Sequence, residues 1–192
     1  MRAQKVINFV VDTLEEKLPS GLVYHLVDHT LDVIEAASRL SKLEGLDEAE
    51  QELVMVAAAL HDLGYTVKYR FNEETAAELA KEILPHYGYH PKEIAIIESC
   101  ILATRIPQTP TSHLAEIVCD ADLDYLGRDD FHHISQKLRN EWINFELIGF
   151  DDKEWNNIQY EFLSQHIYFT KSANKLRNEQ KQKHLNQIKN LI

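Results

Sequence analysis

Two histidines and an aspartate, His25, His29 and Asp32, are spaced four and three residues apart in the sequence. In a helix this spacing places the three side chains on one face, so both imidazoles can point at the same small volume. Converging imidazoles can bind a metal ion or exchange protons with a ligand. The spacing also fits a surface helix with scattered polar residues. Further candidate ligands elsewhere in the chain are needed to distinguish a functional site from such a helix.

A second pair, His61 and Asp62, follows the apolar run 54–60, which contains three alanines. A run without polar residues predicts an interior helix, and Gly64 is a typical residue just beyond its end. An imidazole and a carboxylate at a buried helix end cost free energy unless something satisfies them, and a divalent cation would do so. The dipeptide arises easily by chance, however, so it needs partners too.

Helical phase separates Asp122 from the acidic residues around it. Glu116, Asp120 and Asp124 follow each other at intervals of four, which predicts one acidic, solvated helix face. Asp122 instead shares a stripe with apolar residues, namely Leu114, Val118, Ala121 and Tyr125. A carboxylate on such a stripe must be protonated, paired or metal-bound. Asp122 is therefore the best carboxylate candidate, with pairing to a buried Arg such as Arg105 as the alternative.

Taken together, His29, the pair His61–Asp62 and Asp122 resemble the signature of the HD-domain superfamily, which comprises metal-dependent phosphohydrolases. The segment 24–33 looks like the matching stretch of cyclic-nucleotide phosphodiesterases, and segments 58–65 and 120–127 look like the second and last motifs of the superfamily. The resemblance covers about residues 20–130. The region 73–130 also resembles a bacterial subfamily of stand-alone or cyclase-fused HD domains.

The resemblance implies that His29, His61, Asp62 and Asp122 bind one divalent metal ion, which could be Mn, Fe, Co, Ni, Zn or Mg. It implies hydrolysis of a phosphomonoester or phosphodiester, in a nucleotide, by a metal-activated water. His25 would protonate the leaving oxygen or, alternatively, orient a ligand, and Asp62 could bridge a second metal. A regulatory module that holds a metal and senses a nucleotide without turnover is the alternative function, and a helical interaction domain with a structural metal is a third.

Relatives with two metals carry further histidines between the second and the last motif. In this sequence residues 103–105, where some relatives have a histidine, contain none. That difference favours one tight metal and disfavours diiron oxygenase chemistry. His86, His90 and His113 are expected on the surface or at helix caps. The cations of the chain that could anchor a phosphate, or be solvated or ion-paired instead, are Lys68, Arg70 and Arg105.

The elements that must position these residues are predicted to be helices throughout. Apolar periodicity and capping residues indicate helices over 6–18, 22–43, 47–62, 73–84, 91–104, 112–126, 131–148, 151–169 and 171–192. We therefore expect an all-α protein, an HD-domain helical bundle with extra C-terminal helices. Residues 1–192 are expected to form a single HD domain, with the motifs in about 20–130 and a helical extension in about 131–192.

Composition limits the partners and the compartment. The net charge of −11 argues against a long nucleic acid as partner. The two cysteines, in apolar helical contexts, are expected to be reduced core thiols of a cytoplasmic protein, and neither a signal peptide nor a membrane span is predicted. The aromatic residues of 151–169 are expected in the core, and the Lys-rich segment 171–192 is expected to be solvated or to contact a second copy in a homo-oligomer.

Overall fold

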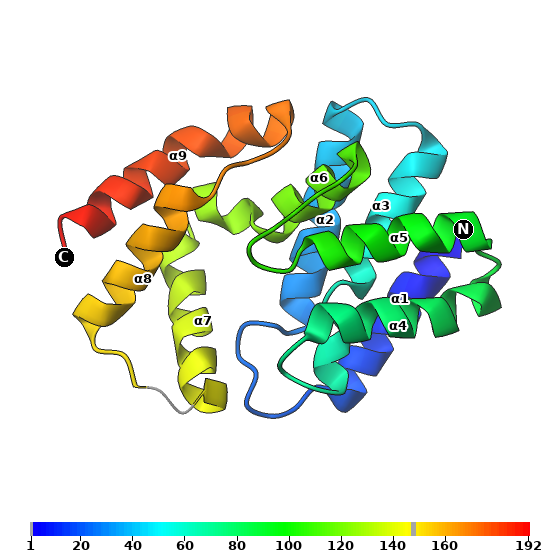
Figure 1. Cartoon of the computed structure of the whole chain (residues 1–192), viewed down its shortest axis with the longest axis horizontal. Helices are drawn as coiled ribbons and strands as arrows, with labels where there is room; N and C mark the ends of the chain where they lie inside the picture. The colour runs from blue at the N-terminus through cyan, green and yellow to red at the C-terminus, as the bar shows by residue number, and fades with distance from the viewer. Residues whose placement is uncertain (1, 147–148) are drawn as a thin grey trace.

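The computed structural model of the chain describes residues 2–146 and 149–192, and the regular elements within these residues are all helices (Figure 1). The prediction of an all-α protein is confirmed. The helices, with short 3-10 helices labelled η, are α1 (Arg2–Lys17), α2 (Val27–Leu43), α3 (Glu48–Leu60), η1 (Leu63–Thr66), α4 (Asn72–Ile83), η2 (Leu84–Tyr87), α5 (Pro91–Ala103), α6 (His113–Asp122), η3 (Asp124–Gly127), α7 (Phe131–Glu146), α8 (Asp152–Gln165) and α9 (Lys171–Lys189). None of them is long and apolar enough to cross a membrane.

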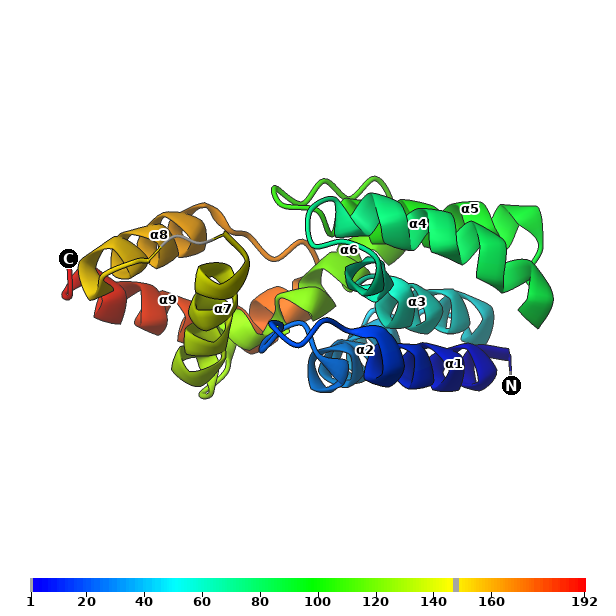
Figure 2. The same ribbon diagram turned by 90° about the horizontal axis from the view of Figure 1, so that it is seen from below.

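Helices α1–α6 form one bundle, and α7–α9 lie together beside it (Figures 1 and 2). Helix α3 is central to the bundle and contacts α1, α2, α5 and α6. Its side chains between Val54 and Leu60 are small or aliphatic and nearly all buried, so neighbouring helices pack closely around it. A capping box of Asp47 and Glu50 fixes where α3 begins, as the sequence predicts.

The basic C-terminal helix α9 packs against η3 and α8 and is not simply solvated. Ala173, Lys181, His184 and Ile188 on one of its faces are buried. Gly127 permits this packing, because a Cβ there would lie 2.3 Å from the carbonyl oxygen of Arg177. The expectation of a solvated segment is therefore wrong for this face.

The expected solvated acidic face on α6 is wrong as well, since Asp120 and Asp124 are 0% and 2% exposed. Asp120 accepts hydrogen bonds from the backbone N–H groups of Phe169 and Thr170, both at 2.8 Å, and from the Thr170 hydroxyl. Asp124 forms ion pairs with Arg39 and Arg177. Asp120 thus binds the segment that leads into α9, and Asp124 binds α9 itself.

Several helix bounds differ from the predictions. Helix α2 begins at Val27, because residues 22–26 form an irregular segment whose backbone N–H groups donate hydrogen bonds to Glu141 of α7. Helix α4 begins at Asn72, one residue before the predicted start, and Phe71 before it has a left-handed backbone with φ of 58°. Helix α6 ends at Asp122 and α8 at Gln165, both earlier than predicted. The predicted end of the seventh helix at Ile148 lies outside the described residues.

Candidate metal centre and acid–base pair

Four side chains from three helices meet near the middle of the molecule. His29 belongs to α2, His61 and Asp62 directly follow α3, and Asp122 is the last residue of α6. His29 Nε2 lies 3.4 Å from Asp62 Oδ2 and 3.3 Å from Asp122 Oδ1. His61 Nε2 lies 3.1 Å and 3.5 Å from the same two oxygens. The structure thus brings together the whole set of predicted ligands.

The inward-facing atoms of this cluster are buried and lack hydrogen bonds. Nε2 of His29, Nε2 of His61 and Oδ2 of Asp62 have no hydrogen-bond partner. Ligand atoms of His29, His61 and Asp122 all lie within 4.8 Å of one another. Buried polar atoms without partners are costly, and a cation among them would bond to each. Two imidazoles with carboxylates form a donor set that suits a divalent transition metal.

Neighbouring groups orient the cluster. His61 Nδ1 donates a hydrogen bond to the carbonyl oxygen of Ala58 at 2.7 Å, so in the neutral ring the lone pair is on Nε2, which faces the two carboxylates. Asn72 Nδ2 donates to Asp62 Oδ1 at 3.2 Å. This contact requires Gly64, because a Cβ there would lie 1.9 Å from the carbonyl oxygen of Asn72.

The two aspartates of the cluster are held as anions. Burial would raise the pKa of both carboxyls, but the adjacent histidines outweigh this effect and lower the pKa of Asp62 and of Asp122. Burial likewise would lower the pKa of His61, and the same two carboxylates raise it instead. The cluster therefore has strong negative potential that attracts a cation.

His25 lies beside the cluster, and its side chain is hydrogen-bonded to a residue of α7. Its Nδ1 donates a hydrogen bond to Oε1 of Glu141, and its Nε2 lies 3.3 Å from the hydroxyl of Tyr65. The rings of His25 and Tyr65 stack with centroids 4.4 Å apart. Burial would lower the pKa of His25, but Asp62 and Glu141 raise it above the usual value. His25 is thus protonated more readily than an ordinary histidine.

Glu141 is a functional candidate that the sequence reasoning missed. Its side chain is fully buried, and Oε2 also accepts the backbone N–H groups of Val23, Tyr24 and His25 at 3.1, 2.8 and 3.0 Å. The argument that selected Asp122 could have found it. Glu141 follows Leu138 by three residues and precedes Phe145 by four, so it falls on an apolar stripe of its helix.

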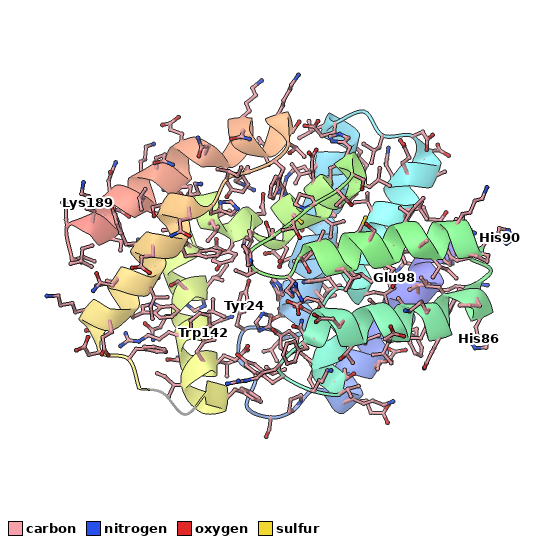
Figure 3. All side chains as sticks on the ribbon, in the orientation of Figure 1. Tyr24, His86, His90, Glu98, Trp142 and Lys189 are labelled. Atoms are coloured by element: carbon pink, nitrogen blue, oxygen red, sulfur yellow. The ribbon has the colours of Figure 1, made fainter. Side chains whose placement is uncertain are left out.

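A cavity of about 260 Å³ opens at the cluster and extends to α7 and α8. In Figure 3, Tyr24 lies between the bundle and α7, and Trp142 lies on α7; both residues line the cavity. His25, Asp62 and Asp122 also line it, so a ligand in the cavity would reach the cluster and His25 together. Glu73 is a third carboxyl in the wall, and burial raises its pKa.

Several other residues considered from the sequence lie away from the cluster or pair with other groups. His86 and His90 lie at the far end of the bundle from Tyr24 (Figure 3). His113 pairs with Glu116, and Arg105 pairs with Glu74 instead of Asp122. Asp32, on the same helix as His29, pairs with Arg128.

A sequence model of the HD domain matches residues 26–124, which is more than half of the chain. The chain belongs to the HD-domain family. The region matched to the HD domain contains His29, His61, Asp62 and Asp122, whereas His25 and Glu141 lie outside it. The extra C-terminal helices of this HD protein thus contribute to the surroundings of its histidine–aspartate cluster.

Individual proteins are similar to this chain in sequence or in fold. An uncharacterized protein of Clostridium beijerinckii is 33% identical over 104 residues, which are 51% of this chain and 62% of that relative. Bacillus subtilis YpgQ, solved in complex with ADP, has a TM-score of 0.68 at 19% identity and aligns over 100% of this chain and 95% of its own. A predicted HD superfamily hydrolase from an uncultured Thermotogales bacterium has a TM-score of 0.62 at 21% identity, over 98% and 90%. The two solved structures share the fold of this chain.

Proposed function

We propose that the protein is a metal-dependent phosphohydrolase that cleaves a phosphomonoester or phosphodiester of a nucleotide, with His29, His61, Asp62 and Asp122 as metal ligands. The observation that carries the proposal is the set of buried nitrogen and oxygen atoms without hydrogen bonds at the centre of the cluster. When bound there, a divalent ion supplies the Lewis acid that polarises a phosphoryl oxygen and activates a water for attack. Mn, Fe, Co, Ni, Zn and Mg are the candidates.

Asp62 supports a centre with one ion. Its Oδ2 faces the two imidazoles, whereas its Oδ1 accepts a hydrogen bond from Asn72. Because Oδ1 is engaged with an amide donor, Asp62 would hold one ion through Oδ2, and a second ion would have to compete with Asn72 for Oδ1.

His25 is proposed as the proton donor. Its Nδ1–H is held by Glu141, so in the protonated ring Nε2–H is the group that can donate to the leaving oxygen. After proton transfer the neutral ring keeps its Nδ1–H on Glu141, and its orientation is preserved. The raised pKa of His25, due to Asp62 and Glu141 against the effect of burial, favours the protonated form that this role requires.

A nucleotide substrate is supported by the cavity and by one structural relative. The cavity is lined by aromatic side chains on the side away from the cluster. Among the solved structures with the same fold, YpgQ was crystallised with ADP. Both observations favour a small nucleotide over a long nucleic acid, as does the net charge of −11.

The test is a substrate screen on protein loaded separately with each candidate metal. Release of phosphate from nucleotides, cyclic nucleotides and model phosphate esters is measured alongside metal content. His25→Gln is expected to lower turnover by about 100- to 10,000-fold at unchanged metal content, as for loss of a general acid. His90→Gln, an exposed histidine far from the cavity, is the matched control. Nucleotide binding without any turnover would contradict the hydrolase and support the regulatory alternative.

A further inference from the structure

The wall of the cavity opposite the histidine–aspartate cluster comes from α7 and α8, outside the region matched to the HD domain. It contains Leu138, Trp142, Trp155, Ile158 and Phe162. The two tryptophan rings meet edge to face, with centroids 5.7 Å apart and an interplanar angle of 86°. An apolar wall of this kind favours a flat aromatic group over an aliphatic or charged one.

A polar pair interrupts this apolar wall. The hydroxyl of Ser135 on α7 donates a hydrogen bond to Oε1 of Gln159 on α8, and both residues line the cavity. Ser135 is 5% exposed. Because Ser135 holds the amide oxygen, the amide Nε2 group of Gln159 is the part left to donate, and within the described residues it has no acceptor. An N–H donor in an apolar wall suits a ring that carries a hydrogen-bond acceptor, which distinguishes a heteroaromatic ring from a plain one.

The charges in the wall limit the number of phosphate groups that the ligand can carry. Three carboxyls line the cavity, those of Asp62, Glu73 and Asp122, and the described lining residues include no Lys or Arg. A bound divalent ion would offset part of this negative charge. Each phosphate beyond the first would add negative charge near carboxylates without a cation from the protein to offset it. The cavity volume of about 260 Å³ is also small for a ligand site.

We propose that the α7–α8 wall is the recognition subsite for a nucleobase and that the substrate is a nucleoside monophosphate, in preference to the diphosphate or triphosphate. Gln159, held by Ser135, donates a hydrogen bond to a ring acceptor, and Trp142, Trp155 and Phe162 surround the ring. This inference rests on the proposed function only in placing the phosphate at the histidine–aspartate cluster, since ring binding itself needs no metal.

The first experiment measures ring binding without a phosphate. Trp142 and Trp155 are the two tryptophans of the chain, and both line the cavity. Intrinsic fluorescence therefore reports on the proposed subsite, and titration with adenosine is expected to change it in metal-free protein. Gln159→Leu is expected to weaken this binding by about tenfold, the effect of one lost hydrogen bond. Gln136→Leu, an exposed residue on α7, is the matched control and is expected to bind as the unmodified protein does.

The second experiment compares substrates on metal-loaded protein. We expect kcat/KM to decrease from adenosine monophosphate to the diphosphate and the triphosphate, and Gln159→Leu to reduce the preference for the monophosphate over phenyl phosphate. Gln159→Glu, which keeps the shape and replaces the donor by oxygen, covers the case in which the leucine variant does not fold. Circular dichroism verifies folding of each variant.

The outcomes separate the subsite from the hydrolase. Adenosine binding that depends on Gln159, with no ester cleaved, supports the subsite and contradicts the proposed function. Hydrolysis that is indifferent to the ring overturns the subsite, and hydrolysis as fast for the triphosphate as for the monophosphate overturns the preference for the monophosphate. Both outcomes leave the hydrolase intact. Equal adenosine binding by the Gln159 and Gln136 variants also overturns the subsite.

Discussion

The carboxylate of Glu141 accepts the Nδ1–H of His25, 116 residues earlier in the chain, and also binds the backbone of the segment that carries it. This segment is not helical, so its conformation depends on these hydrogen bonds and not on a helix of its own. Helix α7 therefore determines where the His25 ring lies relative to the cluster of His29, His61, Asp62 and Asp122. Glu141 acts through His25 and is a positioning residue.

Replacing Glu141 by Gln is expected to lower turnover by about 10- to 100-fold, the effect typical of a lost orienting partner. Because Glu141 contributes to raising the pKa of His25, that pKa falls in the variant. Proton donation is then lost at a lower pH, so the alkaline limb of the pH–rate profile moves to lower pH. The profile of kcat over the accessible pH range measures both effects.

The matched control is Glu179→Gln, an exposed glutamate of α9 that pairs only with Lys183 among the described residues. It is expected to leave rate and profile unchanged. An unchanged profile in Glu141→Gln, at unchanged metal content and fold, would show that His25 does not depend on this carboxylate.

Metal binding can be tested at Asp122 independently of catalysis. We expect about one divalent ion per chain in the unmodified protein and close to none in Asp122→Asn, because the cluster loses an anionic ligand. An ion that binds only the folded state stabilises it, so a chelator is expected to lower the unfolding temperature of the unmodified protein and not of the variant. Elemental analysis and thermal unfolding provide the readouts.

His86→Ala is the control for that experiment, since His86 is exposed and lies at the far end of the bundle from Tyr24, which contacts His29 of the cluster (Figure 3). Full metal content in Asp122→Asn would remove Asp122 from the set of ligands.

Features with local causes were predictable from the sequence. The capping boxes of Asp47 with Glu50 and of Asp151 with Glu154 form as their spacing predicts, because each involves one turn of chain. Helical phase also placed Asp122 correctly, toward the cluster. The bond from Glu141 to the segment before α2 was not predictable in the same way, because no periodicity relates residues so far apart.

The error at Asp120 and Asp124 has the same origin. Their spacing with Glu116 describes one helix face, but spacing does not reveal whether another helix covers that face. Helix α9 and the segment before it lie there, and supply Thr170 and Arg177 as partners. Sequence patterns therefore identified the four residues of the cluster and missed the groups by which the C-terminal helices are joined to the bundle.

The pH dependence of stability is expected to reflect His166. Burial and the charge of Lys181 lower the pKa of His166 to about 3, and Lys181 Nζ lies 3.2 Å from His166 Nδ1. The unfolded chain, with a histidine pKa of about 6.5, binds a proton that the folded one does not. The contribution of His166 to the free energy of unfolding is therefore fully present above about pH 6.5 and is lost as the pH falls toward the folded pKa. The loss amounts to up to about 2 kcal/mol between about pH 7 and about pH 5.

Urea unfolding at the two pH values measures this loss. In His166→Asn, which cannot titrate, the decrease is expected to be smaller by that amount. His133→Asn, an exposed histidine, is the control and should show the decrease of the unmodified protein. Identical losses in His166→Asn and the unmodified protein would show that His166 titrates normally.

The ion pairs of Asp124 should couple the bundle to the C-terminal helices. Its carboxylate accepts from Arg39 of α2 at 2.8 Å and from two nitrogens of Arg177 of α9 at 2.8 and 2.9 Å, and the side chain is 3% exposed. Asp124→Asn leaves both arginines without their shared anion, which is expected to cost about 3 kcal/mol of unfolding free energy. Asp152→Asn, whose pair with Arg139 involves a carboxylate 92% exposed, should cost less than about 1 kcal/mol.

The same unfolding experiments test whether residues 1–192 form one domain, as we propose. Circular dichroism follows all helices, whereas fluorescence follows Trp142 and Trp155 in α7 and α8. If the helices on both sides of Asp124 unfold as one unit, the two signals change at the same denaturant concentration, and Asp124→Asn shifts them together. Two separate transitions, with only the fluorescence signal shifted by Asp124→Asn, would contradict this and make α7–α9 a unit of their own.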